Sequence, residues 1–357
     1  MKALRLSAVR QLEYRACPEP KLPQGWALIE VKACGICMTD IHMYVGEFPV
    51  KMPVTLGHEF CGIVRDLNTC EVPRYHGIGV SRQVQVGDRV AINPLLYCGV
   101  CSSCLSGRPN LCVFPKALGG AGDVVIDGAF AEYTAVPISS MGPMPDDMGW
   151  DRGAMVEPVA CCLHGIDRSR IKQGDIVAVI GAGPIGLTLV QLAALHGAGS
   201  VLSIEKDPIR GEEAKKIGAT ETLNPEEERF DAAFQTVTQG RKADVVIEAV
   251  GSAETSELAL RLVKKGGWVN LFGVAPEDAV FPCHPFHIYY DEIQLIGTYA
   301  LTPDAFRRSL SLLGSGRVDV KHLITHRLSL EDGQQGFDLT VNRVGLKKIL
   351  FPHSASG

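Results

Sequence analysis

Four cysteines lie close together in the first third of the chain, within the stretch CGVCSSCLSGRPNLC. They are Cys98, Cys101, Cys104 and Cys112. The short gaps between the first three allow neighbouring thiolates to turn toward one tetrahedral ion, and the fourth cysteine closes the set. Because four thiolates leave no position open for a substrate, the pattern predicts a structural zinc site. Disulfides and buried free thiols are the alternatives, and this spacing is unusual for both.

A second group of candidate metal ligands is spread over three segments. Cys37 lies in the stretch CGICMTDIH, His58 and Glu59 follow Gly57, and Glu157 comes much later. A mixed set of thiolate, imidazole and carboxylate suits zinc and can leave one position open. Such an open site polarises an alcohol or carbonyl oxygen. Spacing by itself leaves the alternative that these are ordinary surface or core residues.

A glycine-rich motif follows the apolar run over 176–180. Gly181, Gly183 and Gly186 form the pattern G-x-G-x-x-G, and a helix is predicted over 184–196. A strand before the motif and a helix after it are the context of a dinucleotide-binding turn. The glycines allow the tight turn, the approach of a pyrophosphate and close packing of helix on strand.

Glu205 follows the motif at the end of the next predicted strand. A carboxylate at this place can accept hydrogen bonds from both ribose hydroxyls and repels a 2′-phosphate, which favours NAD over NADP. Arg210 lies nearby and weakens this preference, because an arginine can bind a 2′-phosphate.

Length and composition limit the protein class. The 357 residues are enough for two domains, with 46% hydrophobic and 21% charged residues, as in globular proteins. A net charge of −5 without a basic run argues against nucleic acid and anionic membranes as partners. The sequence has no uncharged apolar run of about 18 residues, so we expect no membrane span. No secretory signal precedes the cysteines, so we expect a cytoplasmic protein that acts on a small molecule.

The predicted elements change in kind near residue 150. Before it lie strand-like runs at 26–32, 59–64, 88–92 and 128–136. A polar stretch over 66–85 predicts a long surface loop with no assigned role, and prolines and glycines over 137–149 predict a connector. From residue 175, strands and helices alternate, which predicts a doubly wound parallel sheet. Residues 301–357 are mixed and are expected to pack back on the first domain.

The motifs occur in the order found in zinc-dependent medium-chain dehydrogenases. CGICMTDIH, GHE, the four-cysteine stretch, GAFAEY, EPVACCLH and VAVIGAGPIGL match that pattern across nearly the whole chain. The chain resembles most closely the branch that holds sorbitol, butanediol and threonine dehydrogenases. The resemblance implies an α/β protein. A GroES-like β-rich catalytic domain would cover 1–149, with the zinc lobe at about 94–115. A Rossmann domain would cover 150–300, and 301–357 would return to the catalytic domain.

The resemblance also implies a second, catalytic zinc. Cys37 and His58 would bind it, and Glu59 and Glu157 would complete its surroundings. Which of the two glutamates binds the metal directly stays open. The classical alcohol dehydrogenases have a cysteine at the position of Glu157, so the glutamate here is typical of the polyol branch.

Further roles follow from the same resemblance. Thr39 would contact the substrate oxygen, His42 would pass its proton outward, and Asp40 would support the zinc-binding histidine. Sorbitol dehydrogenase has a tyrosine where this chain has Met43 and a substrate-binding arginine where it has Ala300. We therefore expect a pocket with fewer donors for a polyhydroxy chain.

Cofactor contacts are implied for the glycine-rich turn, the next strand end and, at the nicotinamide end, two later segments. They are Gly181, Gly183, Pro184, Ile185, Gly186, Glu205, Arg210, Phe272, Gly273, Val274, Thr298, Tyr299 and Ala300. The expected activity is reversible oxidation of a secondary alcohol to a ketone with NAD, by a homodimer or homotetramer with two zinc ions per chain. A threonine-type amino-alcohol dehydrogenase is the alternative within the family. A non-enzymatic zinc-ribbon binding module is the alternative outside it.

Overall fold

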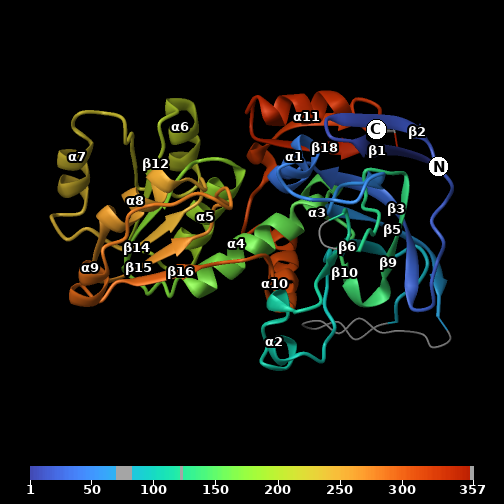
Figure 1. Cartoon of the computed structure of the whole chain (residues 1–357), viewed down its shortest axis with the longest axis horizontal. Helices are drawn as coiled ribbons and strands as arrows, with labels where there is room; N and C mark the ends of the chain where they lie inside the picture. Colours follow the sequence, from blue (N-terminus) through green and yellow to red (C-terminus); the bar gives the residue numbers. More distant parts are fainter. Residues whose placement is uncertain (70–82, 121–123, 354–357) are drawn as a thin grey trace. The chain divides into compact units, whose positions relative to one another are not determined.

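The computed structural model describes residues 1–69, 83–120 and 124–353, which form two compact units (Figure 1). One unit comprises residues 1–160 and 301–357, and the other comprises residues 161–300. The division falls within the helix α4 (Val156–Arg168) rather than at residue 150. The connector expected over 137–149 contributes β10 (Met141–Pro143) to a sheet, and α3 (Trp150–Ala154) packs against β3 and β5.

Among the described residues, the first unit is built on a seven-stranded sheet with the order β10–β6–β5–β3–β18–β17, in which β9 also pairs with β3. Its other strands are β3 (Trp26–Gly35), β5 (Glu59–Asn68), β6 (Arg89–Ile92), β9 (Tyr133–Pro137), β17 (Ile324–Ser329) and β18 (Lys347–Phe351). Smaller sheets contain β1 (Lys2–Ala8), β2 (Gln11–Ala16) and β4 (Val54–Thr55), and β7 (Leu95–Leu96) with β8 (Lys116–Ala117).

Short helices connect and cover these strands. They are α1 (Met38–Val45), α2 (Ser102–Leu105), α10 (Pro303–Gly314) and α11 (Gly333–Val341), with 3-10 turns η1 (Pro109–Leu111), η2 (Ile138–Ser140) and η3 (Lys321–Leu323). The core of the unit contains buried residues from β1, β3, β5, α1 and α11. Because β17 and β18 join the sheet beside β3, the C-terminal segment shares the core of the N-terminal residues.

Residues 161–300, all of which are described, contain a six-stranded sheet with the order β13–β12–β11–β14–β15–β16. The strands are β11 (Ile176–Ile180), β12 (Ser200–Ile204), β13 (Glu221–Leu223), β14 (Ala243–Glu248), β15 (Val263–Leu271) and β16 (Gln294–Gly297). The helices are α5 (Pro184–Leu195), α6 (Pro208–Lys216), α7 (Phe230–Val237), α8 (Ala253–Leu262) and α9 (Pro285–Tyr290). Every pair in the sheet is parallel, so the expected doubly wound sheet is confirmed.

The order of the strands explains how the helices are arranged. From β11 the chain moves outward to β12 and β13, and from β14 it moves outward in the opposite direction to β15 and β16. Right-handed crossovers in opposite directions place helices on both faces of the sheet. Both faces of β11 are consequently buried, and its five residues are all apolar.

Two local expectations from the sequence are wrong. Strand β5 continues to Asn68, so residues 66–68 pair with β3 instead of opening a loop. Residues 70–82 of that expected loop lie outside the described residues. Residues 128–132 also fall outside the strand expected there, because β9 begins at Tyr133.

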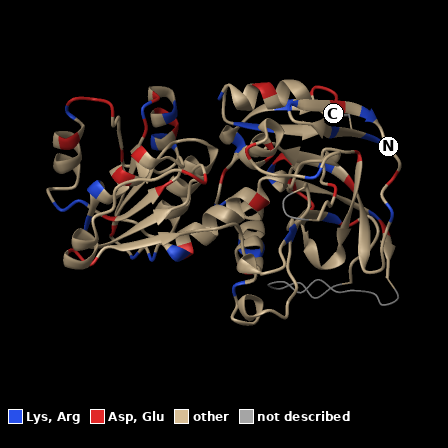
Figure 2. Cartoon of the chain, in the orientation of Figure 1, with Lys and Arg blue, Asp and Glu red and all other residues tan. Residues whose placement is uncertain are grey.

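Basic and acidic residues are interspersed along the ribbon of both units in Figure 2. Within the described residues the ribbon shows no large region of one sign, in keeping with the net charge of −5. In the described part of the chain, no helix has the length and apolar character needed to span a membrane.

Candidate functional site: two metal clusters and a cofactor edge

The four cysteines of the predicted structural site converge in the lobe between β7 and β8. Their Sγ atoms all lie within 4.8 Å of one another. The distance is 3.5 Å between Cys101 and Cys104, and 4.0 Å both for Cys98 with Cys104 and for Cys101 with Cys112. Four sulfurs at the usual zinc distance on a tetrahedron would lie about 3.8 Å apart. The lobe therefore has the dimensions and the ligand set of a four-cysteine zinc site.

Backbone amides stabilise thiolates in this lobe. The amide of Cys98 donates to Cys112 Sγ at 3.4 Å, and the amide of Cys101 donates to Cys98 Sγ at 3.3 Å. Hydrogen bonds from the backbone of Val113 and Cys104 lower the pKa of the Cys101 thiol to about 6. Desolvation and the neighbouring sulfurs raise the pKa of Cys104 to about 12. Four thiolates this close would need a compensating cation, and a zinc ion would supply that charge.

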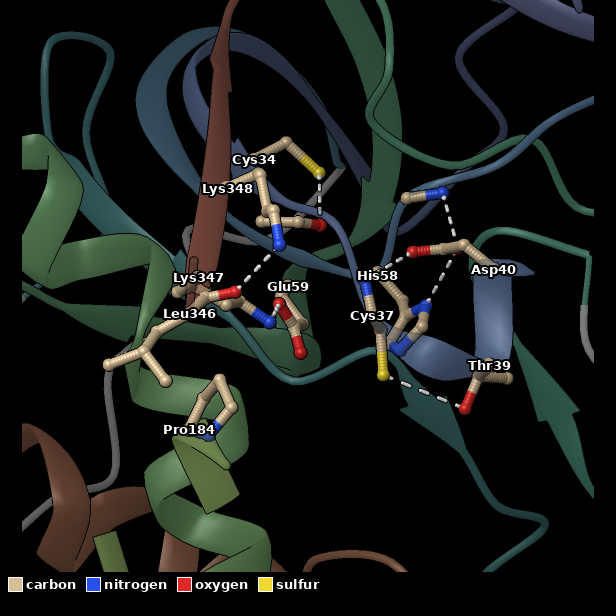
Figure 3. A network of polar contacts seen from close by, with 12 residues as sticks. Cys34, Cys37, Thr39, Asp40, His58, Glu59, Pro184, Leu346, Lys347 and Lys348 are labelled. Atoms are coloured by element: carbon tan, nitrogen blue, oxygen red, sulfur yellow. Dashed lines mark hydrogen bonds and ion pairs between the residues drawn. The ribbon is translucent and has the colours of Figure 1, made fainter. Parts of the chain in front are cut away.

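The second cluster forms where β3 and β5 end side by side. Gly35 of β3 lies opposite Glu59 of β5, so Cys37, at the N-terminus of α1, comes beside His58. Gly57 has a φ of +93°, and a Cβ there would meet an aromatic ring at 2.7 Å, so glycine is required at the turn before His58. One ligand atom each from Cys37, His58 and Glu59 lies within 4.8 Å of the others (Figure 3).

Asp40 holds the first two of these side chains in place. It is fully buried, and its Oδ2 accepts a hydrogen bond from the Cys37 amide at 2.9 Å. Its Oδ1 accepts from the Gly57 amide at 3.2 Å and lies 3.4 Å from His58 Nδ1 (Figure 3). Burial by itself would lower the pKa of His58, but Asp40 and Cys37 raise it well above its usual range. A histidine fixed through Nδ1 presents Nε2 to a metal.

Lys347 is a site residue that the sequence analysis missed. Its Nζ forms an ion pair with the Glu59 carboxylate, and the two side chains are only 7% and 1% exposed (Figure 3). Burial by itself would lower the pKa of Lys347, but Glu59, Cys37 and Glu157 raise it. Glu157 is buried on α4, yet its carboxylate is outside the group of ligand atoms found among the described residues.

Thr39 and His42 lie on α1, which begins directly after Cys37. Thr39 Oγ1 is 3.6 Å from Cys37 Sγ, so its hydroxyl borders the cluster. His42 Nδ1 forms a hydrogen bond with the Glu47 carboxylate, and its ring stacks on Phe48 with the centroids 4.8 Å apart. Glu47 was also missed, because nothing in its sequence context distinguishes it from a surface glutamate.

Met43 does not line an open pocket, contrary to the expectation from its position. Its side chain is 2% exposed and belongs to the core of the first unit, together with Ile41 and Tyr44 of the same helix. The other residue expected to shape the substrate pocket, Ala300, ends the second unit and has a φ of +56°.

The glycine-rich turn joins β11 to α5. Gly181 has a φ of +96°, and a Cβ at Gly186 would collide with the Gly181 carbonyl oxygen, so glycine is required at both positions. Gly183 precedes α5, Pro184 is its first residue and Ile185 lies in its first turn. The amides of this first turn and the positive end of the helix are groups that can bind a phosphate.

Glu205 directly follows β12 and supports this turn. Its Oε2 accepts a hydrogen bond from the Ala182 amide at 2.6 Å, and its Oε1 accepts from the Asp207 amide at 2.9 Å. Each carboxylate oxygen can accept more than one bond, so both can still bind ribose hydroxyls. Arg210 Nε lies 3.7 Å from the Asp207 carboxylate.

The two later segments lie at the same edge of the sheet as the glycine-rich turn. Residues 272–274 follow β15 and residues 298–300 follow β16, and parallel pairing brings these strand ends together. The Thr298 amide donates to the Leu271 carbonyl at 3.1 Å, and the Thr298 hydroxyl lies 2.9 Å from Asn270 Oδ1. Tyr299 is 60% exposed.

Comparison with known proteins identifies relatives of the whole chain. The family model of the alcohol dehydrogenase GroES-like domain matches residues 23–146, and that of the zinc-binding dehydrogenases matches residues 184–315. Sorbitol dehydrogenase of Bacillus subtilis (strain 168) is 32% identical, over 99% of this chain and 98% of that protein. L-threonine 3-dehydrogenase of Bacillus velezensis is 33% identical, over 94% of each. A zinc-binding dehydrogenase of Sinorhizobium meliloti 1021, solved with NADP, has a TM-score of 0.90 and 36% identity, covering 98% of this chain and 99% of that one.

Proposed function

Because the chain belongs to the family of zinc-dependent medium-chain dehydrogenases, we propose that it catalyses the reversible oxidation of a secondary alcohol to a ketone with NAD. It is an enzyme of the alcohol and polyol dehydrogenase type that uses zinc and a nicotinamide cofactor. The observation that carries the proposal is the cluster of Cys37, His58 and Glu59 around buried Asp40. Such a mixed ligand set can leave a position for the substrate.

We propose two zinc ions per chain, of which the four-cysteine lobe holds the structural one. Cys37 and His58 would hold the catalytic one, with Glu59 and Glu157 completing its surroundings. Zn²⁺ and Lys347 would bring three positive charges to a buried site that holds the thiolate of Cys37 and the carboxylates of Asp40, Glu59 and Glu157. Opposite charges this close offset much of the penalty for burying each ion. When bound, the zinc polarises the oxygen of the alcohol and makes its proton more acidic.

Two residues of α1 would carry that proton outward, with the ribose of the cofactor between them. The Thr39 hydroxyl borders the metal cluster and is placed to accept the proton of the substrate hydroxyl. His42, further along the helix, is held by Glu47 and Phe48 and would pass the proton toward solvent. The hydride chemistry is supplied by the nicotinamide when the cofactor is bound.

Replacing Glu205 by alanine is expected to narrow the preference for NAD over NADP. A charge-assisted hydrogen bond contributes about 1.5–3 kcal/mol, so the NAD:NADP ratio of kcat/KM should fall about tenfold or more. The ratio is the informative quantity, because loss of the Ala182 contact should weaken the binding of both NAD and NADP. Glu212→Ala on α6 is the control, since Glu212 is exposed and outside the turn. A wild-type preference for NADP, the cofactor bound to the Sinorhizobium meliloti relative, would contradict the proposal and direct attention to Arg210.

A panel of alcohols tests the substrate class. Ala300 has no donor where the sorbitol enzyme has an arginine, so we expect a permissive enzyme. The kcat/KM values for sorbitol, galactitol, 2,3-butanediol, threonine and 2-propanol should lie within about two orders of magnitude, because an apolar pocket discriminates weakly. A strong preference for one hexitol, with the short alcohols inert, would contradict this reading. A strong preference for threonine would favour the amino-alcohol dehydrogenase. A separate measurement addresses the zinc-ribbon module: if protein fluorescence did not change on addition of NADH, that alternative would be favoured.

We propose that the chain forms a homodimer, or a homotetramer of such dimers, through the β16 edge of the second unit. Apolar side chains are exposed beside this edge, with Phe286 at 64%, Tyr289 at 80% and Tyr290 at 61%. Antiparallel pairing of β16 with its copy would satisfy the edge strand and cover these residues. Sedimentation should show at least a dimer, and Tyr289→Glu should shift it toward monomer. A wild-type protein that stays monomeric at micromolar concentration would contradict the proposal.

A further inference from the structure

In the sheet of the second unit, the direction in which the chain adds strands reverses between β11 and β14. These strands are neighbours, and the chain leaves them toward opposite sides of the sheet. Ligands of doubly wound sheets bind beyond the carboxyl ends of the strands at such a switch point. The glycine-rich turn after β11 and the turn over 249–251 after β14 would form the two sides of such a crevice.

A buried carboxylate lies directly beneath the second turn. Glu248, the last residue of β14, is 1% exposed. Its Oε1 accepts hydrogen bonds from the amides of Val250 at 2.7 Å and Gly251 at 2.8 Å, and from the Thr255 hydroxyl at 2.9 Å. Thr255 also forms the capping box of α8 with Ser252. The single carboxylate thus anchors both the turn and the start of the helix.

The backbone of the same residue anchors the segment after β15. The Glu248 carbonyl accepts hydrogen bonds from the amides of Phe272 at 2.9 Å and Gly273 at 2.8 Å. A Cβ at Gly273 would collide with the Gly251 amide, and a Cβ at Gly251 would collide with the Val274 carbonyl. The two segments pack backbone to backbone, so displacement of one must displace the other.

The turn after β14 also contacts the turn after β11. The Ala249 amide donates to the Ile180 carbonyl at 3.0 Å, and a Cβ at Gly181 would lie 2.7 Å from a methyl carbon of Val250. The inward-pointing amides of Val250 and Gly251 are already bound by Glu248, so they are not available to a phosphate. The pyrophosphate is left to α5, and this side of the crevice suits the uncharged amide and ring of the cofactor.

We propose that Glu248 is a positioning residue for the nicotinamide half of the cofactor. It holds residues 249–251 and 272–274 in register, and these segments in turn would fix the position of the nicotinamide ring, which exchanges the hydride with the substrate. The adenosine half depends instead on the glycine-rich turn and Glu205. This inference rests on the proposed function, because it requires a dinucleotide in the crevice. Local pattern does not reveal the role, since a glutamate at a strand end is usually exposed.

The test compares NAD with ADP-ribose, which lacks the nicotinamide. In Glu248→Ala, the Kd for NAD should rise and kcat should fall, each by about tenfold or more, because three hydrogen bonds lose their acceptor. The Kd for ADP-ribose should change less than about twofold. Glu248→Gln keeps one acceptor oxygen and should move the ratio of the two Kd values in the same direction by a smaller amount. Glu257→Gln, on the exposed side of α8, is the charge-matched control and should leave the Kd values for NAD and ADP-ribose unchanged.

The outcomes separate positioning from general stability. Equal weakening of NAD and ADP-ribose in both Glu248 variants would overturn the inference, as would normal kcat and NAD affinity in either. If Glu248→Ala shows no folded state in a thermal melt, Glu248→Gln is the deciding variant. An unchanged ratio of the Kd values for NAD and ADP-ribose in Glu248→Gln would then be enough to overturn the inference. Wild-type protein that binds neither ligand would refute the proposed cofactor as well, and this result appears before any variant is made.

Discussion

Replacing Cys37 by serine is expected to remove alcohol oxidation while leaving the fold intact. In the described part of the chain, Cys37 is the one thiolate ligand in the cluster with His58 and Glu59. Polarisation of the substrate oxygen by a metal contributes several kcal/mol to catalysis. Because about 1.4 kcal/mol corresponds to a tenfold change in rate, kcat/KM should fall by about 10³-fold. Steady-state kinetics and zinc per chain measure the effect.

A matched control exists in the same unit. Cys17 is half-buried and lies outside both metal clusters, so Cys17→Ser should keep full turnover and both zinc ions. The melting temperature of Cys37→Ser should stay close to that of the wild type, since Asp40 still accepts the backbone amide that begins α1. Normal turnover in Cys37→Ser, or full activity in zinc-free protein, would show that the catalytic assignment is wrong.

Replacing Cys101 by serine should instead reduce stability. Structural zinc contributes about 10–16 kcal/mol of folding free energy in small zinc-binding peptides, so loss of one of four ligands should destabilise the lobe strongly. We expect one zinc per chain instead of two, a lower melting temperature and new proteolytic cleavage between Leu95 and Ala117. Activity per folded molecule should fall much less than in Cys37→Ser, because this site has no position for substrate.

The exposed Cys283 provides the control for this second prediction. Cys283→Ser removes a thiol far from the lobe in sequence and should leave zinc content and melting temperature unchanged. If Cys101→Ser kept two zinc ions and the wild-type melting temperature, the four cysteines would not form a structural metal site.

Short-range spacing was enough to predict the four-cysteine lobe and the glycine-rich turn as local arrangements. Cys98 to Cys112 and Gly181 to Gly186 each lie within one short stretch, so the local conformation of the chain brings the groups together. The order of motifs was likewise enough for the family, and alternating strand and helix patterns were enough for the parallel sheet; both are confirmed. Each of these inferences depends on neighbours in the sequence.

Only the tertiary structure decided what surrounds the second cluster. Lys347 reaches Glu59 because β18 and β5 both pair with β3, an arrangement that no local pattern contains. Met43 packs into the core of the first unit, which the resemblance at this position did not predict, because packing against other segments decides which side of a short helix is buried. The side-chain partners of Glu248 lie within seven residues of it, whereas the amides of Phe272 and Gly273 reach its carbonyl only because β14 and β15 pair. Ligands and turns follow from local chemistry, whereas the charges and supports around them follow from long-range strand pairing.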